Sequence, residues 1–153
     1  MENGLPEYQV KAEKLLSGAR VEVSPETYAV ISLTHTNWTS LLDNPELSPR
    51  MTAPFLIFKD RWEVTMVLDE EDYLTVRHAV RDAGVEKGFR LLSFDVDLGF
   101  DVIGFMARIS AILADAGISI LPVSSFSRDH VLVKQGDLAK ALRALRGHIA
   151  EVC

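Results

Sequence analysis

Hydrophobic residues recur at helical spacing in two stretches of the second half of the chain. The first stretch, residues 103 to 116, predicts an amphipathic helix that Gly117 ends as a left-handed C-cap. Its apolar face would consist of Ile103, Phe105, Met106, Ile109, Ile112, Leu113 and Ala116. The second stretch begins at Asp137, a candidate N-cap, repeats leucine and alanine at positions 138, 141, 142 and 145, and stops at Gly147.

Apolar runs with strand character lie on either side of the first helix. Residues 89–96 predict a strand before it, and residues 118–124 and 130–134 predict two strands after it. The second half therefore follows the order β-α-β-β-α. A closing strand over residues 148–153 is short and has few apolar side chains.

The first half carries weaker patterns. We expect a short helix over 6–16, then a hairpin of strands 19–23 and 28–34 joined at Pro25. Three prolines between residues 37 and 54 argue against a long regular element there, so we expect a structured loop with a short helical turn. Strands 55–58 and 62–68 predict a second hairpin, and a helix then follows the acidic run 69–72 as far as residue 83.

These patterns predict an α+β fold of the ferredoxin-like βαββαβ type, with helices on one face of an antiparallel or mixed sheet. The first half supplies strands of its own, so we expect two halves that share one sheet or pair their edges. The expected limits are an N-terminal segment over 1–18, a first half over 19–87 and a second half over 88–153.

Composition and charge exclude several classes of function. Hydrophobic residues make up 48% of the chain and charged residues 25%, which is typical of a folded globular protein. The net charge of -6 argues against a nucleic-acid surface. No apolar run approaches the roughly 20 residues that cross a bilayer. A single cysteine, Cys153, allows no intrachain disulfide, and we expect a cytoplasmic protein without membrane association.

The same reasoning leaves no cofactor or metal to expect. The acidic residues 69–72 lack the alternating spacing and the turn glycine of a calcium loop. We interpret them as solvated acids that favour the first turn of a helix.

The loop between residues 95 and 104 is the most informative chemical feature. It contains Gly99 and Gly104 and leads directly into the N-terminus of the first helix. Backbone N–H groups at a helix N-terminus lack intrahelical partners and carry partial positive charge, so this loop could hold a small anion such as a carboxylate.

Four segments in this order resemble the ACT domain family, in particular tandem ACT-like proteins related to the cytosolic arginine sensor and small bacterial ACT domain-containing proteins. The segments are DLGFDVIG over 97–104, LADAGISI over 113–120, SSFSRDHVLVK over 124–134 and DLAKAL over 137–142. The match covers residues 88 to 147 well. The hairpin 55–68 resembles the first ACT-like half of such proteins more loosely.

The resemblance implies a non-catalytic fold in which ACT units pair side by side and bind small molecules, usually amino acids, at their interface. It also implies a homodimer, and a protein partner is a further expectation. The implied ligand-binding residues are Leu98, Gly99, Phe100, Asp101, Val102, Ile103, Gly104, Ser124, Ser125, Phe126 and Asp129.

Each polar candidate also has a structural interpretation. Asp101 is favoured as the N-cap of the helix, although a cap can also bind ligand. For Asp129 a turn role and a ligand role are equally favoured, and the hydroxyls of Ser124 and Ser125 are better explained as turn formers. Phe126 fits a core or an interface. His130 is interpreted as a packed histidine.

Three functions remain open at this stage. No nucleophile with a base, metal set or paired carboxylate is legible, so we expect no enzyme, although side chains far apart in sequence could still form an active site. The favoured function is a small-molecule binding or sensing module that acts through an ACT–ACT interface. The alternative is a ligand-free oligomerisation or interaction module.

Overall fold

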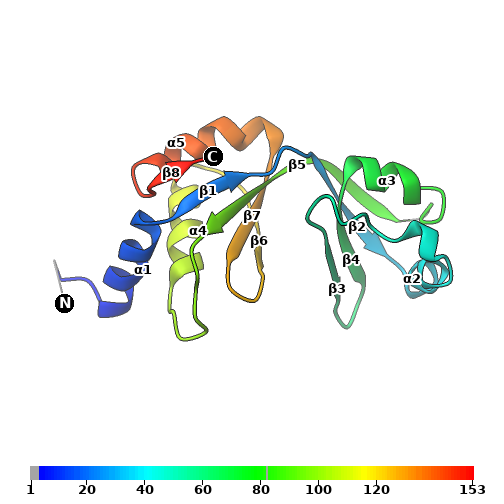
Figure 1. Ribbon diagram of the computed structural model, residues 1–153, viewed down its shortest axis with the longest axis horizontal. Helices are drawn as coiled ribbons and strands as arrows, with labels where there is room; N and C mark the ends of the chain where they lie inside the picture. The colour runs from blue at the N-terminus through cyan, green and yellow to red at the C-terminus, as the bar shows by residue number, and fades with distance from the viewer. Residues whose placement is uncertain (1–3, 82) are drawn as a thin grey trace. The chain divides into compact units, whose positions relative to one another are not determined.

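The computed structural model describes residues 4–81 and 83–153. The chain divides into two compact units, with residues 1–25 and 90–153 in unit 1 and residues 26–89 in unit 2. The strand β5 (Gly84–Asp95) passes from unit 2 into unit 1, as the ribbon in Figure 1 shows. Each unit has its own hydrophobic core.

Unit 2 has the order βαββαβ. Its elements are β2 (Tyr28–Leu33), α2 (His35–Leu42), the 3₁₀ turn η1 (Pro45–Leu47), β3 (Leu56–Lys59), β4 (Val64–Asp69), α3 (Glu70–Val76) and the first half of β5. The sheet order is β3-β4-β2-β5, with every pair antiparallel. The predicted second hairpin is confirmed, because β3 and β4 pair directly from Lys59 and Val64 back to Leu56 and Val67.

Both helices of unit 2 cover the same face of its sheet. Alternate residues of β2 enter one hydrophobic cluster together with Leu41 of α2 and Val76 of α3. Residues two apart on a strand point to the same face, so this face of the sheet packs against both helices. The helix expected as far as residue 83 is too long, because α3 ends at Val76.

Of two further expectations for the first half, the short helical turn is in fact an eight-residue helix, and the hairpin at Pro25 is wrong. Residues 35–42 form the helix α2, whose N-cap Thr34 accepts a hydrogen bond from Asn37 N at 3.1 Å. The first of the three prolines follows this helix, so it ends the element instead of preventing it. The strands around Pro25 do not form a hairpin, since β2 pairs with β4 and β5 whereas β1 (Arg20–Val23) pairs with β5 and β8.

Unit 1 contains a second βαββαβ series together with the N-terminal segment. The series is the second half of β5, α4 (Phe105–Asp115), β6 (Leu121–Ser124), β7 (Asp129–Lys134), the 3₁₀ turn η2 (Gln135–Asp137), α5 (Leu138–Arg146) and β8 (Glu151–Val152). The sheet order is β8-β1-β5-β7-β6. The strand β1 lies antiparallel to β5 and parallel to the short β8, so residues 20–23, which precede unit 2 in the chain, supply most of that edge.

Helices α1 (Glu7–Ser17), α4 and α5 contribute to one core with the strands of unit 1 (Figure 1). Leu16, Ile109 and Leu145, one from each helix, are all fully buried. Burying a leucine or isoleucine side chain contributes about 1.5–3 kcal/mol. The predicted α+β, ferredoxin-like fold with helices over one sheet face is confirmed.

Polar contacts hold α1 against α4. Glu13 of α1 accepts hydrogen bonds from Arg108 of α4 and from Nδ1 of His148, the latter at 3.0 Å. Burial opposes the charge of Glu13, but the bonds from Arg108 and His148 outweigh it and lower the pKa of this carboxyl. At the other end of α4, Gly117 N–H donates to Ala114 O and Ile118 N–H to Leu113 O, which is the predicted C-terminal glycine motif.

Candidate ligand-binding site

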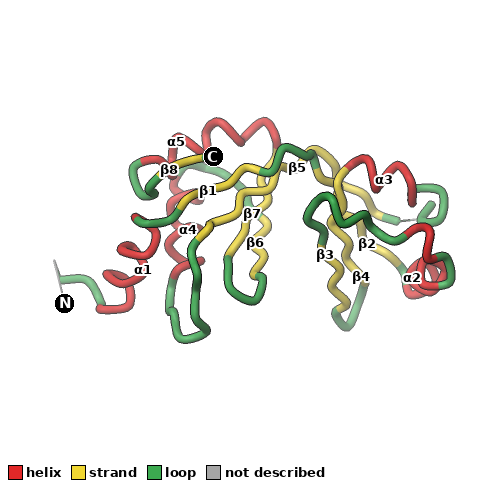
Figure 2. Tube along the Cα trace, viewed as in Figure 1, coloured by secondary structure: helices red, strands yellow, loops and turns green. Residues whose placement is uncertain are grey.

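Two connecting segments of unit 1 meet beside the N-terminus of α4. The loop after β5 and the turn between β6 and β7, both green in Figure 2, lie at the same end of the unit. Between them is an open hollow of about 380 Å³, which we call the candidate site. Its lining consists of Leu98, Gly99, Phe100, Val102, Gly104, Phe105, Met106, Ala107, Ser124, Ser125, Phe126, Ser127, Arg128 and Asp129.

The start of α4 is shaped by glycine and by a buried aromatic ring. Gly104 is the N-cap residue and has a φ of 83°, a left-handed conformation that glycine adopts without strain. Phe105 follows it and packs in the core, where its ring lies edge-on to Phe94 at 6.0 Å. Among the described residues, no side chain caps α4, so its first-turn N–H groups have no side-chain acceptor, and the residues of that turn line the candidate site.

The opposite wall is a tight turn closed by hydrogen bonds. Ser125 N–H donates to Arg128 O at 2.9 Å, and the Ser125 hydroxyl donates to the same oxygen at 3.1 Å. The Ser124 hydroxyl donates to Asp129 Oδ1 at 2.6 Å, across the last strand pair of the hairpin. Both serine hydroxyls therefore form the turn, as their structural interpretation predicts.

Direct contacts join the two walls. Leu98 N–H donates to Ser127 O at 2.8 Å. The rings of Phe100 and Phe126 meet edge to face with centroids 5.0 Å apart, although each side chain is 81% exposed. Phe126 thus lies on the surface beside another aromatic ring and does not fill the core of unit 1.

The structure brings together every predicted site residue except two. Asp101 and Ile103 do not line the hollow, and Ile103 is 63% exposed. The interpretation of Asp101 as the helix N-cap is wrong, because Gly104 holds that position. The Asp101 carboxylate instead folds back toward Gly99, within 2.6 Å of where a Cβ on that glycine would lie.

Sequence reasoning missed five lining residues. Three of them, Phe105, Met106 and Ala107, form the first turn of α4, and Ser127 and Arg128 complete the turn between the predicted serines and Asp129. Their position in the sequence was the available signal, since residues 105–107 directly follow the predicted loop and residues 127–128 lie between the predicted Phe126 and Asp129.

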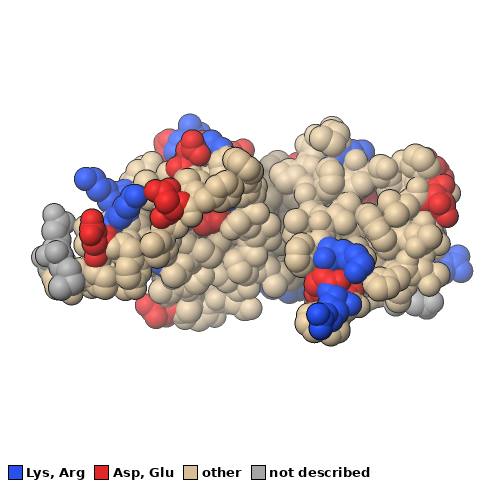
Figure 3. Space-filling view, turned by 90° about the horizontal axis from the view of Figure 1, so that it is seen from below, with Lys and Arg blue, Asp and Glu red and all other residues tan. Residues whose placement is uncertain are grey.

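Charges at the candidate site are mixed in sign. Arg128 Nε pairs with Asp95 Oδ1 at 2.9 Å, and both side chains are nearly half exposed, so water weakens this pair. Asp129 adds a carboxylate, and the helix N-terminus adds partial positive charge. On the face of the described residues drawn in Figure 3, basic and acidic side chains are interspersed without one broad area of either sign.

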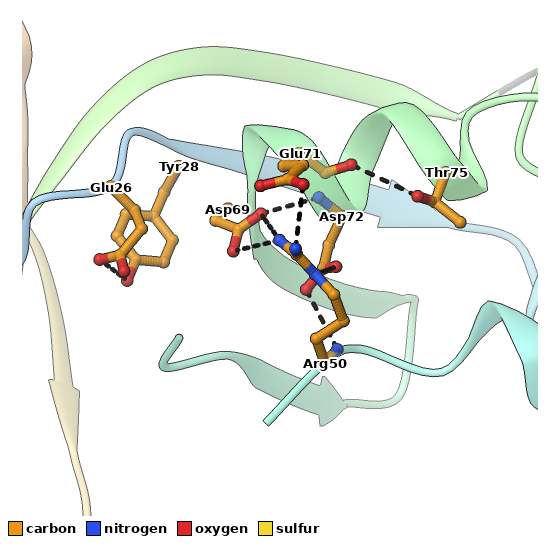
Figure 4. Close-up of polar contacts among 7 residues, drawn as sticks. All are labelled: Glu26, Tyr28, Arg50, Asp69, Glu71, Asp72 and Thr75. Atoms are coloured by element: carbon orange, nitrogen blue, oxygen red, sulfur yellow. Dashed lines mark hydrogen bonds and ion pairs between the residues drawn. The ribbon is translucent and has the colours of Figure 1, made fainter. Parts of the chain in front are cut away.

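The acidic run 69–72 lies in unit 2 and binds an arginine (Figure 4). Asp69 caps α3 by accepting from Asp72 N–H at 2.7 Å, and Arg50 Nε pairs with Asp72 Oδ1 at 2.6 Å. Hydrogen bonds to Asp72 and Glu71 raise the pKa of Arg50. The acids do occupy a first helical turn, but Asp69 and Asp72 are buried, so the description of all four as solvated is wrong.

The described residues contain neither a metal-binding cluster nor a membrane-spanning helix. Within 4–81 and 83–153, no group of three or more His, Cys, Asp or Glu side chains is arranged to hold a metal ion. Over the same residues, no helix combines the length and the apolar character needed to cross a membrane.

The element order and sheet topology define a ferredoxin-like α+β protein. Residues 84–147 match the sequence model of the ACT domain. Comparison with curated proteins gave no significant match.

Solved structures with the same fold cover nearly the whole chain. A protein from Agrobacterium tumefaciens aligns with a TM-score of 0.68 at 20% identity, over 89% of this chain and 92% of that one. A protein of unknown function from Vibrio cholerae, described as a possible transport protein, gives 0.66 at 22% identity over 92% and 98%. The ligand-free regulatory subunit of aspartate kinase from Thermus thermophilus gives 0.60 at 12% identity over 87% and 98%.

Proposed function

We propose that this protein is a non-catalytic module that binds an amino acid at the candidate site and acts through an ACT–ACT interface. The observation that carries the proposal is the pairing of opposite charges around one hollow. The uncapped N-terminus of α4 offers N–H donors to an α-carboxylate, and Asp129 offers an acceptor to an α-ammonium group. The volume of about 380 Å³ falls in the range of small-molecule sites.

The comparisons support a regulatory role. Residues 84–147 match the ACT domain, and one similar fold is the regulatory subunit of a kinase. We therefore propose that binding, and not turnover, is the activity of this chain.

The exposed side chains around the candidate site support a second copy of the chain as the partner. Phe100, Ile103 and Phe126 are 81%, 63% and 81% exposed, and pairing two ACT domains side by side would remove such surface from water. In this proposal the ligand shifts the equilibrium toward the arrangement that binds it more tightly, by no more than its differential affinity. The output is then a change in self-association or in the binding of another protein.

A thermal-shift screen of the twenty amino acids tests the proposal. A ligand present at 100 times its Kd stabilises the folded state by about 2.7 kcal/mol, which raises the melting temperature measurably. We expect at least one amino acid to raise the melting temperature and Asp129→Ala to abolish the shift. Asp97→Ala is the matched control, because Asp97 is exposed in the same loop but does not line the hollow. No shift at millimolar concentrations would remove the proposal.

A ligand-free assembly module is the second candidate, and the exposed pair Phe100 and Phe126 favours it. Analytical ultracentrifugation separates the two functions. If no amino acid binds but Phe126→Asp converts a dimer to a monomer, assembly is the function of this surface.

A further inference from the structure

A chain of three side chains connects the sheet of unit 1 to the candidate site. His130 on β7 lies between two hydroxyl groups, with Nδ1 at 2.8 Å from Ser93 Oγ on β5 and Nε2 at 3.0 Å from Ser125 Oγ in the turn. Both ring nitrogens therefore have partners. The histidine is half-buried, as its interpretation as a packed residue predicts.

The hydrogen-bond pattern assigns the direction of each bond. The Ser125 hydroxyl donates its hydrogen to Arg128 O, so this oxygen can only accept from the ring. Nε2 of His130 then carries the proton, and the unprotonated Nδ1 accepts from the Ser93 hydroxyl. Burial lowers the pKa of His130, with the Asp129 charge opposing this shift and the Arg128 charge adding to it, which favours the neutral ring that the pattern requires.

The hydrogen bond from His130 bears on both walls of the candidate site. Ser125 closes the turn through Arg128 O, and the neighbouring Ser127 O accepts from Leu98 N–H of the opposite loop at 2.8 Å. The Ser125 hydroxyl donates to Arg128 O and accepts from the His130 ring, so two of its hydrogen bonds hold the turn that forms one wall of the site.

We propose that His130 is a positioning residue for the candidate site, and that donation from its Nε2–H to Ser125 holds the turn 125–128 and, through Ser127, the loop that leads to α4. This inference rests on the proposed function for its effect on ligand affinity. Its effect on the turn and the loop does not depend on any ligand.

Two substitutions of His130 separate positioning from simple packing. The amide nitrogen of Gln reaches the place of Nε2 and preserves the bond to Ser125, whereas the shorter Asn reaches only the place of Nδ1 and Ser93. The probe is the amino acid that most raises the melting temperature of the unmodified protein. We expect His130→Asn to weaken its binding about tenfold, as the loss of one good hydrogen bond allows, and His130→Gln to keep affinity within about threefold.

Ser125→Ala tests the hydrogen bond between His130 and Ser125 without altering His130. It removes both the acceptor for His130 and the hydroxyl donor to Arg128 O, so it should weaken binding at least as much as His130→Asn does, and adding His130→Asn to it should cause no further loss. If Asn and Gln at position 130 weaken binding equally, or if neither does, the positioning role is overturned while the proposed function stands.

A measurement without ligand distinguishes failure of this inference from failure of the proposed function. Hydrogen exchange followed by NMR reports on the Leu98 amide, which bonds to Ser127 O, and on the Ile109 amide in α4 as a reference. We expect faster exchange at Leu98 in His130→Asn but not in His130→Gln, with Ile109 unchanged in both. If no amino acid binds the unmodified protein, the proposed function fails, and unchanged exchange at Leu98 in His130→Asn would still overturn the positioning role.

Discussion

Gly104 is the residue on which the start of α4 depends. A Cβ there would lie 3.1 Å from Cδ2 of Tyr8, and the φ of 83° already strains any other residue. We therefore expect Gly104→Ala to lower the free energy of unfolding by about 1–3 kcal/mol. Urea denaturation of the purified protein measures this difference.

Gly147→Ala is the matched control for that substitution. Gly147 has a φ of -73°, and a Cβ there would have no atom within 4 Å. We expect a change within about 0.5 kcal/mol. Equal losses in the two variants would show that the backbone conformation of Gly104 is not what makes it necessary.

His130 also makes stability depend on pH. Its pKa is lowered from 6.5 chiefly by burial, so below that value the unfolded chain binds a proton that the folded chain resists. The contribution of neutral His130 to the free energy of unfolding is therefore present above about pH 6.5, and it is lost as the pH falls through the lower folded-state pKa. We expect denaturation midpoints between about pH 7.5 and 5.5 to fall more for the unmodified protein than for His130→Gln. Parallel curves for the two proteins would refute this.

The helix α3 depends on its cap within a buried acidic cluster. Asp69 Oδ1 accepts from Asp72 N–H at 2.7 Å and also lies 3.4 Å from an Arg50 nitrogen. Asp69→Ala should cost about 0.5–2 kcal/mol through loss of the cap, measured by chemical denaturation. Asp69→Asn keeps a cap acceptor and should retain most of that stability. An equal loss in the Asn variant would assign the role to the ion pair with Arg50.

The elements show which parts of the fold a sequence can predict. The amphipathic repeat of α4 and the turn between β3 and β4 are local signals, so the helix, its glycine stop and that hairpin were predicted correctly. The pairing of β1 was not, because its partners in β5 and β8 lie far away in sequence and a proline turn beside β2 gives no information about them.

At the candidate site, too, local features could be predicted from the sequence and long-range contacts could not. Glycines and serines marked the loop and the turn that the structure brings together. The N-cap was misplaced because an aspartate before a helix is a common capping signal, and nothing local shows that Gly104 is left-handed. The hydrogen bonds of His130 to Ser93 and Ser125 could not be predicted, since they depend on the register of β5 and β7. Whether a ligand binds at these residues stays a prediction.

The ACT domain match leaves out part of unit 1, the unit that contains most of the matched residues. Leu16 lies far outside residues 84–147, yet it is fully buried in the core of unit 1. We expect Leu16→Ala to lower the free energy of unfolding by about 2–5 kcal/mol, through lost burial and the cavity that it leaves. Calorimetry or denaturation of the full chain measures the loss.

Leu5→Ala is the matched control, since it removes the same atoms from a side chain that is 47% exposed. A small effect there beside a large one at Leu16 would show that the N-terminal segment belongs to the structural core of the domain. Similar small effects would mean that unit 1 holds together without α1.

The two stretches of chain that connect the units lie next to each other within unit 1. Ser24 N–H donates to Leu91 O at 3.0 Å, and Arg90 returns a bond to Ser24 O at 3.0 Å. Unit 2 is thus inserted between two paired strands of unit 1. A protease that cuts inside residues 26–89 would divide unit 1 into two polypeptides, which only hydrogen bonds and core packing would hold together.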